Sequence, residues 1–316
     1  MDRVCFGIDI GGTTVKMGLF REDGALLRKW EIPTRTENQG QAILTDIRDA
    51  VVKVMEEEHI TADQVAGIGM GVPGPVTEDG TVLGCVNLGW GVFNVEEALQ
   101  ALTGFPVSAG NDANVAALGE QWKGAGSEYQ NLVMVTLGTG VGGGIILGGR
   151  ILAGPKGAAG EIGHMPMFTD EVKPCSCGKT GCLEQSASAT GLVAHARRML
   201  QQCDTTSKLR EIDNFTAKDV CDCAGQGDEV ALAALNLATR MLGTAMAHIG
   251  CVLNPEAFLI GGGMSRAGDI IFSRVKKVYD ELVFPACRNT PILPAKLGND
   301  AGIYGAARMV LQRGEG

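Results

Sequence analysis

The chain has 316 residues, of which 45% are hydrophobic, and its formal net charge is -9 at pH 7. This length exceeds that of one typical domain, so we expect two domains, and the hydrophobic content is enough for packed interiors. The negative charge, without a cluster of basic residues, argues against nucleic acid or an anionic membrane surface as a partner.

The first predicted unit is a strand, a glycine turn and a second strand. Residues 4–8 form an apolar run, residues 9–14 (DIGGTT) form the turn, and residues 15–20 alternate as a strand does. The same arrangement returns later, where residues 132–137 meet a glycine-rich turn that starts at Gly138. Such turns leave backbone amides accessible to a phosphate group, although one turn alone could be an ordinary hairpin.

Helical patterns alternate with short apolar strands between and after these units. Helices are predicted at residues 43–55 and 113–122, and strands at residues 65–72 and 107–109. This alternation is typical of α/β layering. The alanine-rich residues 301–311 predict a last helix that packs onto the first domain.

Asp112 follows the strand predicted at residues 107–109 and directly precedes an alanine-rich helix. It could simply be the N-cap of that helix. A carboxylate in this place could also accept a proton from a substrate hydroxyl during phosphoryl transfer, and the helix dipole would keep it ionised.

Other glycine motifs are less specific. Residues 138–144 match the spacing of a dinucleotide fingerprint, but residues 145–152 predict a hairpin where that motif needs a helix. The tripeptide at residues 178–180 (GKT) is not a phosphate-binding P-loop, because Lys173 stands where the motif requires glycine. Residues 261–263 (GGG) end a predicted strand and favour a nucleotide site over a turn without a ligand.

One cluster of three cysteines and a histidine has the composition of a closed tetrahedral zinc site. Its four members are His164, Cys175, Cys177 and Cys182. The cysteines share one tight loop, so a structural zinc ion is favoured over a disulfide or over small apolar residues. Glu161 and Glu184 flank the cluster. The metal would therefore hold two acids in place.

The other seven of the ten cysteines are scattered, and we expect them to stay reduced. No signal peptide is recognised, which favours a cytoplasmic location. The apolar residues 241–253 are too few to span a bilayer and predict a buried helix.

Four motifs together resemble the ROK family of sugar kinases. In chain order they are residues 9–16 (DIGGTTVK), 137–144 (LGTGVGGG), 161–164 (EIGH) and 175–184 (CSCGKTGCLE). The resemblance implies an actin-like ATPase (ribonuclease H-like) α/β fold, in which two α/β domains flank a ligand cleft. We expect a small domain of residues 1–112 and 300–316, and a large domain of residues 113–299 that carries the zinc cluster.

The resemblance also implies the roles of the site residues. Asp112 would be the general base, and with Asn111 it would hold the O4 and O6 side of the sugar. Glu161, His164 and Glu184 would hold O1, O2 and O3. Two further positions match sugar-binding loops of the family, Gly71 and Asn87, although turn stability alone would explain the first equally well.

ATP and Mg²⁺ are the implied cofactors, beside the structural Zn²⁺. Asp9 would contact Mg²⁺ through water. The other residues expected to bind the nucleotide are Gly11, Gly12, Thr13, Lys16, Gly138, Thr139, Gly140, Gly262 and Gly263, the last two near the adenosine.

Residues 184–191 (EQSASATG) and 87–90 (NLGW) resemble the glucokinases of that family. The expected reaction is therefore ATP-dependent phosphorylation of glucose at O6 to glucose 6-phosphate. A kinase for mannose, allose, fructose or N-acetylmannosamine would keep the same motifs. A sugar sensor without catalysis is the alternative of another class, but it would not need Asp112, and residues 1–3 are too few for a DNA-binding module. A homodimer or homotetramer is expected.

Overall fold

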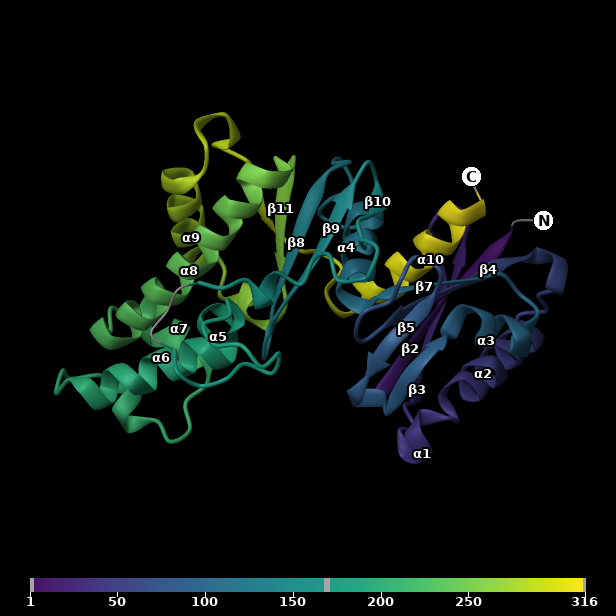
Figure 1. The fold of residues 1–316 in the computed structure, drawn as a ribbon, viewed down its shortest axis with the longest axis horizontal. Coiled ribbons are helices and arrows are strands. Elements are labelled where there is room, and N and C mark those ends of the chain that lie inside the picture. The colour runs from purple at the N-terminus through teal and green to yellow at the C-terminus, as the bar shows by residue number, and fades with distance from the viewer. Residues whose placement is uncertain (1–2, 168–170, 315–316) are drawn as a thin grey trace. The chain divides into compact units, whose positions relative to one another are not determined.

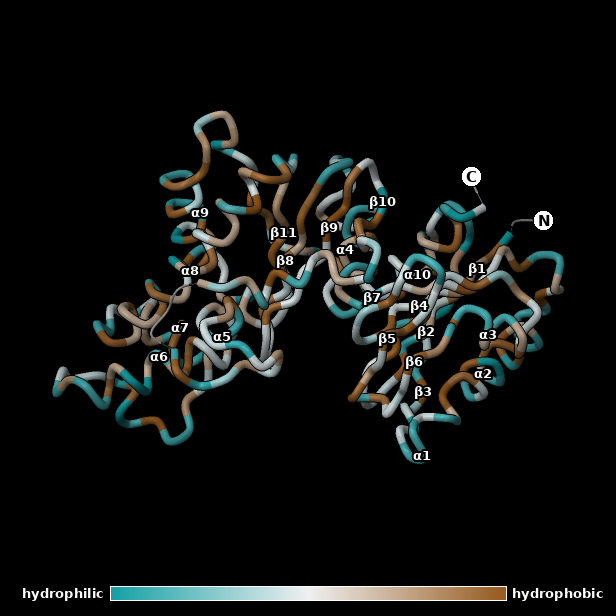
Figure 2. The backbone as a smooth tube through the Cα atoms, in the orientation of Figure 1, coloured by the Kyte–Doolittle hydropathy of each residue, from teal (hydrophilic) through white to brown (hydrophobic). Residues whose placement is uncertain are grey.

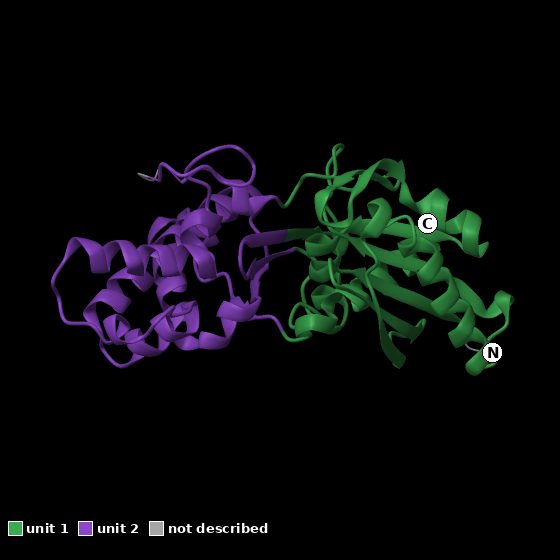
Figure 3. Cartoon of the chain, turned by 90° about the horizontal axis from the view of Figure 1, so that it is seen from below, with its two compact units in different colours: residues 1–131, 144–160, 296–316 green, residues 132–143, 161–295 purple. Residues whose placement is uncertain are grey.

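The chain folds into two compact units (Figure 3). Unit 1 comprises residues 1–131, 144–160 and 296–316, and unit 2 comprises residues 132–143 and 161–295. The computed structural model describes residues 3–167 and 171–314. These units differ from the predicted domains, because helix α4 (Asp112–Lys123) packs against the last helix, α10 (Ala301–Gly314), and joins unit 1.

Unit 1 is built on a five-stranded sheet with the order β3-β2-β1-β4-β7 (Figure 1). Its strands are β1 (Val4–Ile10), β2 (Thr14–Arg21), β3 (Leu26–Pro33), β4 (Val65–Val72) and β7 (Val107–Asn111). The first three strands are antiparallel, whereas β1, β4 and β7 run parallel. The predicted strand, glycine turn and strand at the start of the chain are confirmed.

Helices cover both faces of this sheet. Besides α4 and α10, they are α1 (Glu37–Gly40), α2 (Ile43–Glu57) and α3 (Val95–Thr103), and a hairpin of β5 (Thr81–Cys85) and β6 (Trp90–Asn94) is added. On one face, the buried residues of α2 and α3 join the main core, because α2 repeats apolar residues at helical spacing. On the other face, α10 packs against β1 and β4. Gly69 permits this approach, since a β-carbon there would lie 1.8 Å from the carbonyl oxygen of Ala306.

The second sheet has the order β10-β9-β8-β11-β12. Its strands are β8 (Leu132–Leu137), β9 (Val141–Leu147), β10 (Arg150–Ile151), β11 (Ala257–Gly261) and β12 (Ile292–Pro294). Strand β9 begins at residue 141, four residues before the predicted start, because its glycines lie in extended backbone within the strand. It pairs with β10 as a hairpin, so the second glycine turn is followed by a strand and not by the helix that a dinucleotide fingerprint requires.

Five helices of unit 2 pack beside this sheet: α5 (Glu184–Ala187), α6 (Ala189–Gln202), α7 (Ala217–Gly225), α8 (Glu229–Leu253) and α9 (Asp269–Leu282). Helix α8 packs against α6, α7 and α9, and β8 and β11 carry mainly hydrophobic residues (Figure 2). Among the described residues, α8 alone is long and apolar enough to cross a membrane by length and composition. The most apolar stretch of α8 is 61% buried inside the structure. Helix α8 includes the predicted buried helix at residues 241–253.

Candidate active site

Three parallel strands of unit 1 end beside one another at predicted site residues. In the strand register, Asp9 of β1 lies opposite Gly71 of β4, and Val72 lies opposite Asn111 of β7. A β-carbon on Gly71 would lie 3.6 Å from Oδ1 of Asp9. The carboxyl ends of parallel strands are the usual place for ligands in α/β proteins, and the structure brings these predicted residues together there.

Asp9 is a buried carboxyl group with a cation on the neighbouring strand. Burial raises the pKa of Asp9, and the positive charge of Lys16, its cross-strand partner, opposes part of that rise. Lys16 Nζ also donates to the carbonyl oxygen of Asn299 at 3.3 Å. A divalent cation at Asp9 would stabilise the ionised carboxylate in the same way as Lys16 does.

The first glycine turn is fixed from the side of β3. Thr34 donates through Oγ1 to the carbonyl oxygen of Gly11 at 2.7 Å and through its backbone N–H to that of Thr13 at 2.9 Å. A β-carbon on Gly12 would meet no atom within 4 Å. The turn is therefore rigid, and the backbone at Gly12 faces open space, as a phosphate-binding turn requires.

Asn111, and not Asp112, is the N-cap of α4, which corrects the simplest interpretation of Asp112. Asn111 Oδ1 accepts from the backbone N–H groups of Ala113 at 3.0 Å and Asn114 at 3.2 Å, and its Nδ2 donates to the carbonyl oxygen of Gly74 at 3.1 Å. Asp112 is the first helical residue, and its Oδ1 accepts from the Ala113 N–H at 2.8 Å. Since capping is done by Asn111, the Asp112 carboxylate is not required as the cap.

Cys85 directly precedes the predicted sugar loop, and its thiol pKa is affected by both the loop and Asp112. Burial raises the pKa of the Cys85 thiol; hydrogen bonds from the backbone amides of Leu88 and Asn87 lower it, and the charge of Asp112 raises it. The backbone of Asn87 thus contacts this thiol, on which the charge of Asp112 also acts. The Asn87 side chain is exposed.

In unit 2 the second glycine turn lines a cavity of about 560 Å³. The predicted residues Gly138, Thr139 and Gly263 are among its lining residues. A β-carbon on Gly138 or Gly263 would meet no atom within 4 Å, so both leave open space above the backbone. Gly262 does not line the cavity; its φ of +82° is left-handed, and a β-carbon there would lie 2.4 Å from the carbonyl oxygen of Leu137. The conformation of the turn thus requires glycine at position 262, whereas Gly263 lines the cavity.

Polar side chains that the sequence motifs did not indicate also line this cavity: Thr216, Lys218, Cys221, Asp222 and Arg266. Thr216 caps α7 by accepting from the Asp219 N–H, while the Asp219 carboxylate accepts from the Thr216 N–H. The Thr-x-x-Asp spacing of such a capping box is visible in the sequence and predicts a helix start, but not a ligand.

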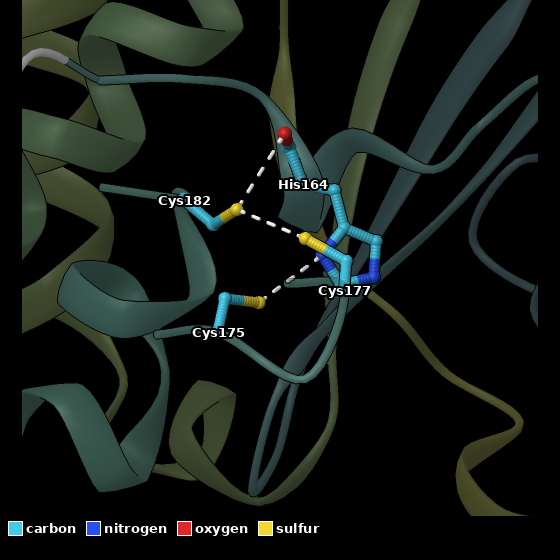
Figure 4. A group of neighbouring side chains, drawn as sticks. All are labelled: His164, Cys175, Cys177 and Cys182. Atoms are coloured by element: carbon cyan, nitrogen blue, oxygen red, sulfur yellow. Dashed lines mark hydrogen bonds between the residues drawn. The ribbon is translucent and has the colours of Figure 1, made fainter. Parts of the chain in front are cut away.

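The four predicted zinc ligands lie together in unit 2 (Figure 4). Their ligand atoms all lie within 4.8 Å of one another; Cys177 Sγ is 3.5 Å from Cys182 Sγ, and Cys175 Sγ is 3.5 Å from Nδ1 of His164. A tetrahedron with Zn–S bonds of about 2.3 Å would place its sulfur ligands about 3.8 Å apart, so the cluster fits zinc. All ten cysteines are free thiols, so no disulfide competes for these ligands.

The thiols of this cluster have shifted pKa values in the absence of a metal ion. Burial raises the pKa of Cys175 and raises that of Cys182 to about 12, whereas the backbone amide of Lys179 lowers that of Cys177. Buried thiols of this kind ionise when they bind a divalent metal ion.

Both predicted acids lie beside the cluster. Glu184 Oε1 lies 2.9 Å from Cys175 Sγ and 3.8 Å from His164 Nδ1, whereas Glu161 Oε2 lies 3.9 Å from His164 Nε2. A β-carbon on Gly140 would lie 2.6 Å from Oε2 of Glu184. The imidazole thus turns Nδ1 to the thiols and Nε2 to Glu161, and Glu184 joins the cluster to the second glycine turn.

Comparison with known proteins agrees with these features. The model of the ROK family matches residues 5–313. A glucokinase of Halalkalibacterium halodurans is 42% identical over 317 aligned positions, which cover 99% of this chain and 96% of the relative.

Two solved structures are similar to this chain. A ROK family glucokinase from Streptomyces griseus, in complex with glucose and AMPPNP, has a TM-score of 0.73 and 32% identity, covering 98% of this chain and 99% of that one. A ROK family transcriptional regulator, a homologue of the E. coli MLC protein, has a TM-score of 0.86 and 26% identity, covering 99% of this chain and 78% of that one. These similarities confirm the predicted actin-like α/β fold, and the chain belongs to the ROK family.

Proposed function

We propose that this chain is an ATP-dependent glucokinase that transfers the γ-phosphoryl group to O6 of glucose. The observation that carries the proposal is that Asp112 begins α4 without being its cap, beside the strand ends that hold Asp9 and Gly71. Asn111 makes the capping hydrogen bonds, so the Asp112 carboxylate is not needed as the helix cap and is the proposed proton acceptor. The similarity to a glucokinase along almost the whole chain supports glucose as the hexose.

In this proposal Asp112 accepts the proton of the sugar O6 hydroxyl as O6 attacks the γ-phosphorus, and ADP leaves with the electrons of the broken P–O bond. Asn111 holds the same side of the sugar, and Gly71 and Asn87 contribute backbone and amide contacts. The N-terminus of α4 stabilises the ionised form of Asp112, which suits a base.

The nucleotide would bind the two glycine turns. The phosphates would contact Gly11, Gly12, Thr13 and Lys16 of unit 1 and Gly138, Thr139 and Gly140 of unit 2. Gly262 and Gly263 would lie near the adenosine. Of these two glycines, Gly263 lines the cavity. Mg²⁺ at Asp9 would supply positive charge that neutralises the transferred phosphoryl group.

We assign a structural role to zinc held by His164 and the three cysteines. Nδ1 would bind the metal, because it faces Cys175, and Nε2–H would donate to a sugar hydroxyl on the side of Glu161. Glu161 and Glu184 would accept hydrogen bonds from the neighbouring hydroxyl groups. Metal content measured on the purified protein tests the zinc assignment.

The deciding experiment compares glucose, mannose, allose, fructose and N-acetylmannosamine with Mg²⁺ and ATP in a coupled assay. The highest kcat/KM for glucose, with phosphate on O6 of the product, is expected. Another preferred sugar would keep the mechanism and change the substrate. Sugar binding without phosphorylation would make the chain a sugar sensor.

We further propose a cytoplasmic homodimer as the minimal unit. The free state of all ten cysteines supports the location. Exposed apolar side chains at the ends of α8 and α9, Val252 and Leu282, support an oligomer. A monomeric mass in light scattering at working concentration would contradict this.

A further inference from the structure

Strand β7, which leads directly into Asp112, lies at the edge of the unit 1 sheet. Backbone groups on the outer side of an edge strand have no strand to pair with. Here side chains take that place. The Ala109 N–H donates to Oε1 of Glu96 at 2.8 Å, and Nη1 of Arg313 donates to the carbonyl oxygen of Val107 at 2.6 Å.

Glu96 and Arg313 also form an ion pair with each other through Oε2 and Nη1. Glu96 lies in the first turn of α3 and Arg313 in the last turn of α10, so each charge is stabilised by the dipole of its own helix. Glu96 is only 7% exposed. The Arg313 side chain is 56% exposed, so the buried partner is Glu96 alone; removing the partner of a buried charge is costly, which favours the observed position of the Glu96 carboxylate.

The site of Glu96 depends on a glycine. Gly80 has a φ of +81°, and a β-carbon there would lie 2.3 Å from Cγ of Glu96. The Glu96 side chain therefore occupies a space that the β-carbon of any other residue at position 80 would fill. The loop that contains Gly80, the helix α3 and the helix α10 all converge on the outer edge of β7.

We propose that Glu96 and Arg313 are positioning residues for Asp112. Strand β4 pairs with β7 on the inner side, and Glu96 and Arg313 bind it on the outer side at Ala109 and Val107, three and five residues before Asp112. Without the pair, the Ala109 N–H and the Val107 carbonyl oxygen lose their outer hydrogen-bond partners, and β7 is then held at these residues by β4 and by helix packing alone. The inference rests on the proposed function, because it takes Asp112 as the base.

The test uses glucose phosphorylation with Mg²⁺ and ATP. Glu96→Ala leaves the Ala109 N–H without its acceptor, and Arg313→Met removes the donor to Val107 while it keeps the aliphatic stem. Because misplacing a catalytic group by about 1 Å can cost up to about a hundredfold in rate, we expect kcat to fall at least about tenfold while KM for glucose changes less. Glu96→Gln keeps an acceptor for Ala109 and should recover most of the lost kcat.

Val54→Ala, in α2, is the control for stability alone, since Val54 is buried and takes no part in the side-chain hydrogen bonds to β7 given above. It should lower Tm and leave kcat unchanged. Normal kcat in both Glu96→Ala and Arg313→Met, with a lowered Tm only, would overturn the inference and leave the proposed function intact.

The second arm repeats Glu96→Ala in an Asp112→Asn background. If the pair acts through Asp112, it should cause no further loss of kcat there. An equal loss in both backgrounds would overturn the inference. Normal turnover of Asp112→Asn alone would refute the base assignment of the proposed function, and the inference with it, so the two failures are distinguishable.

Discussion

Gly302 lies in the first turn of α10, directly against the side chain of Asp9. A β-carbon there would lie 2.6 Å from Cγ and 2.7 Å from Oδ2 of Asp9. Nonbonded carbon atoms pack at about 3.5–4.0 Å, so Gly302→Ala must displace the Asp9 carboxylate, or the helix turn beside it, by about 1 Å. The same substitution favours the helix by up to about 1 kcal/mol, because alanine has the higher helix propensity. Gly302→Ala should therefore lower activity without a matching loss of stability.

We expect Gly302→Ala to lower kcat by about tenfold to a hundredfold, the range for a misplaced catalytic group, with Tm lowered little or not at all. The Mg²⁺ concentration for half-maximal rate should rise, since Asp9 is the proposed contact to Mg²⁺. Steady-state kinetics over a Mg²⁺ titration, with thermal unfolding in parallel, measures both. Gly314→Ala is the matched control, because a β-carbon there meets no atom within 4 Å. Unchanged kcat and Mg²⁺ dependence in Gly302→Ala would refute the role of Asp9.

Three further substitutions test other parts of the site. Cys177→Ser should reduce bound zinc and weaken sugar binding before it affects ATP binding; titration calorimetry with each ligand checks this, and unchanged sugar affinity would contradict the structural role of zinc. Lys16→Met removes the charge that opposes the raised pKa of Asp9, so this carboxyl should lose its charge at a higher pH as the solution is acidified, and the acid limb of kcat/KM for ATP should move to higher pH. An acid limb that stays at the same pH or moves to lower pH would contradict this prediction. Thr216→Ala should destabilise the start of α7 by about 1 kcal/mol and weaken ATP binding, measured by equilibrium dialysis, while glucose binding is unchanged.

The elements of this fold could be predicted where their cause is local. Both glycine turns follow apolar runs, and β1, β2 and β8 lie where the sequence predicted them. The unit boundaries could not be predicted, because they depend on a helix crossing. A β-carbon on Gly119 of α4 would lie 2.1 Å from the carbonyl oxygen of Ala301 in α10. Only glycine lets these two helices approach so closely, and a single glycine in a helical pattern does not indicate its distant partner.

In the candidate site too, local features could be predicted from the sequence and long-range contacts could not. The cluster of His164 and three cysteines could be predicted because the cysteines lie within one loop, and its geometry is compatible with the proposed zinc. The contacts that hold the end of β7 could not, because Glu96 and Arg313 are 217 residues apart in the sequence and neither belongs to a motif. Motifs identify groups that touch a ligand, since ligands constrain residue type and local spacing. The groups that place a catalytic carboxylate are constrained only by where the fold brings them, so an exchange that preserves the contact could occur at either residue without altering any motif.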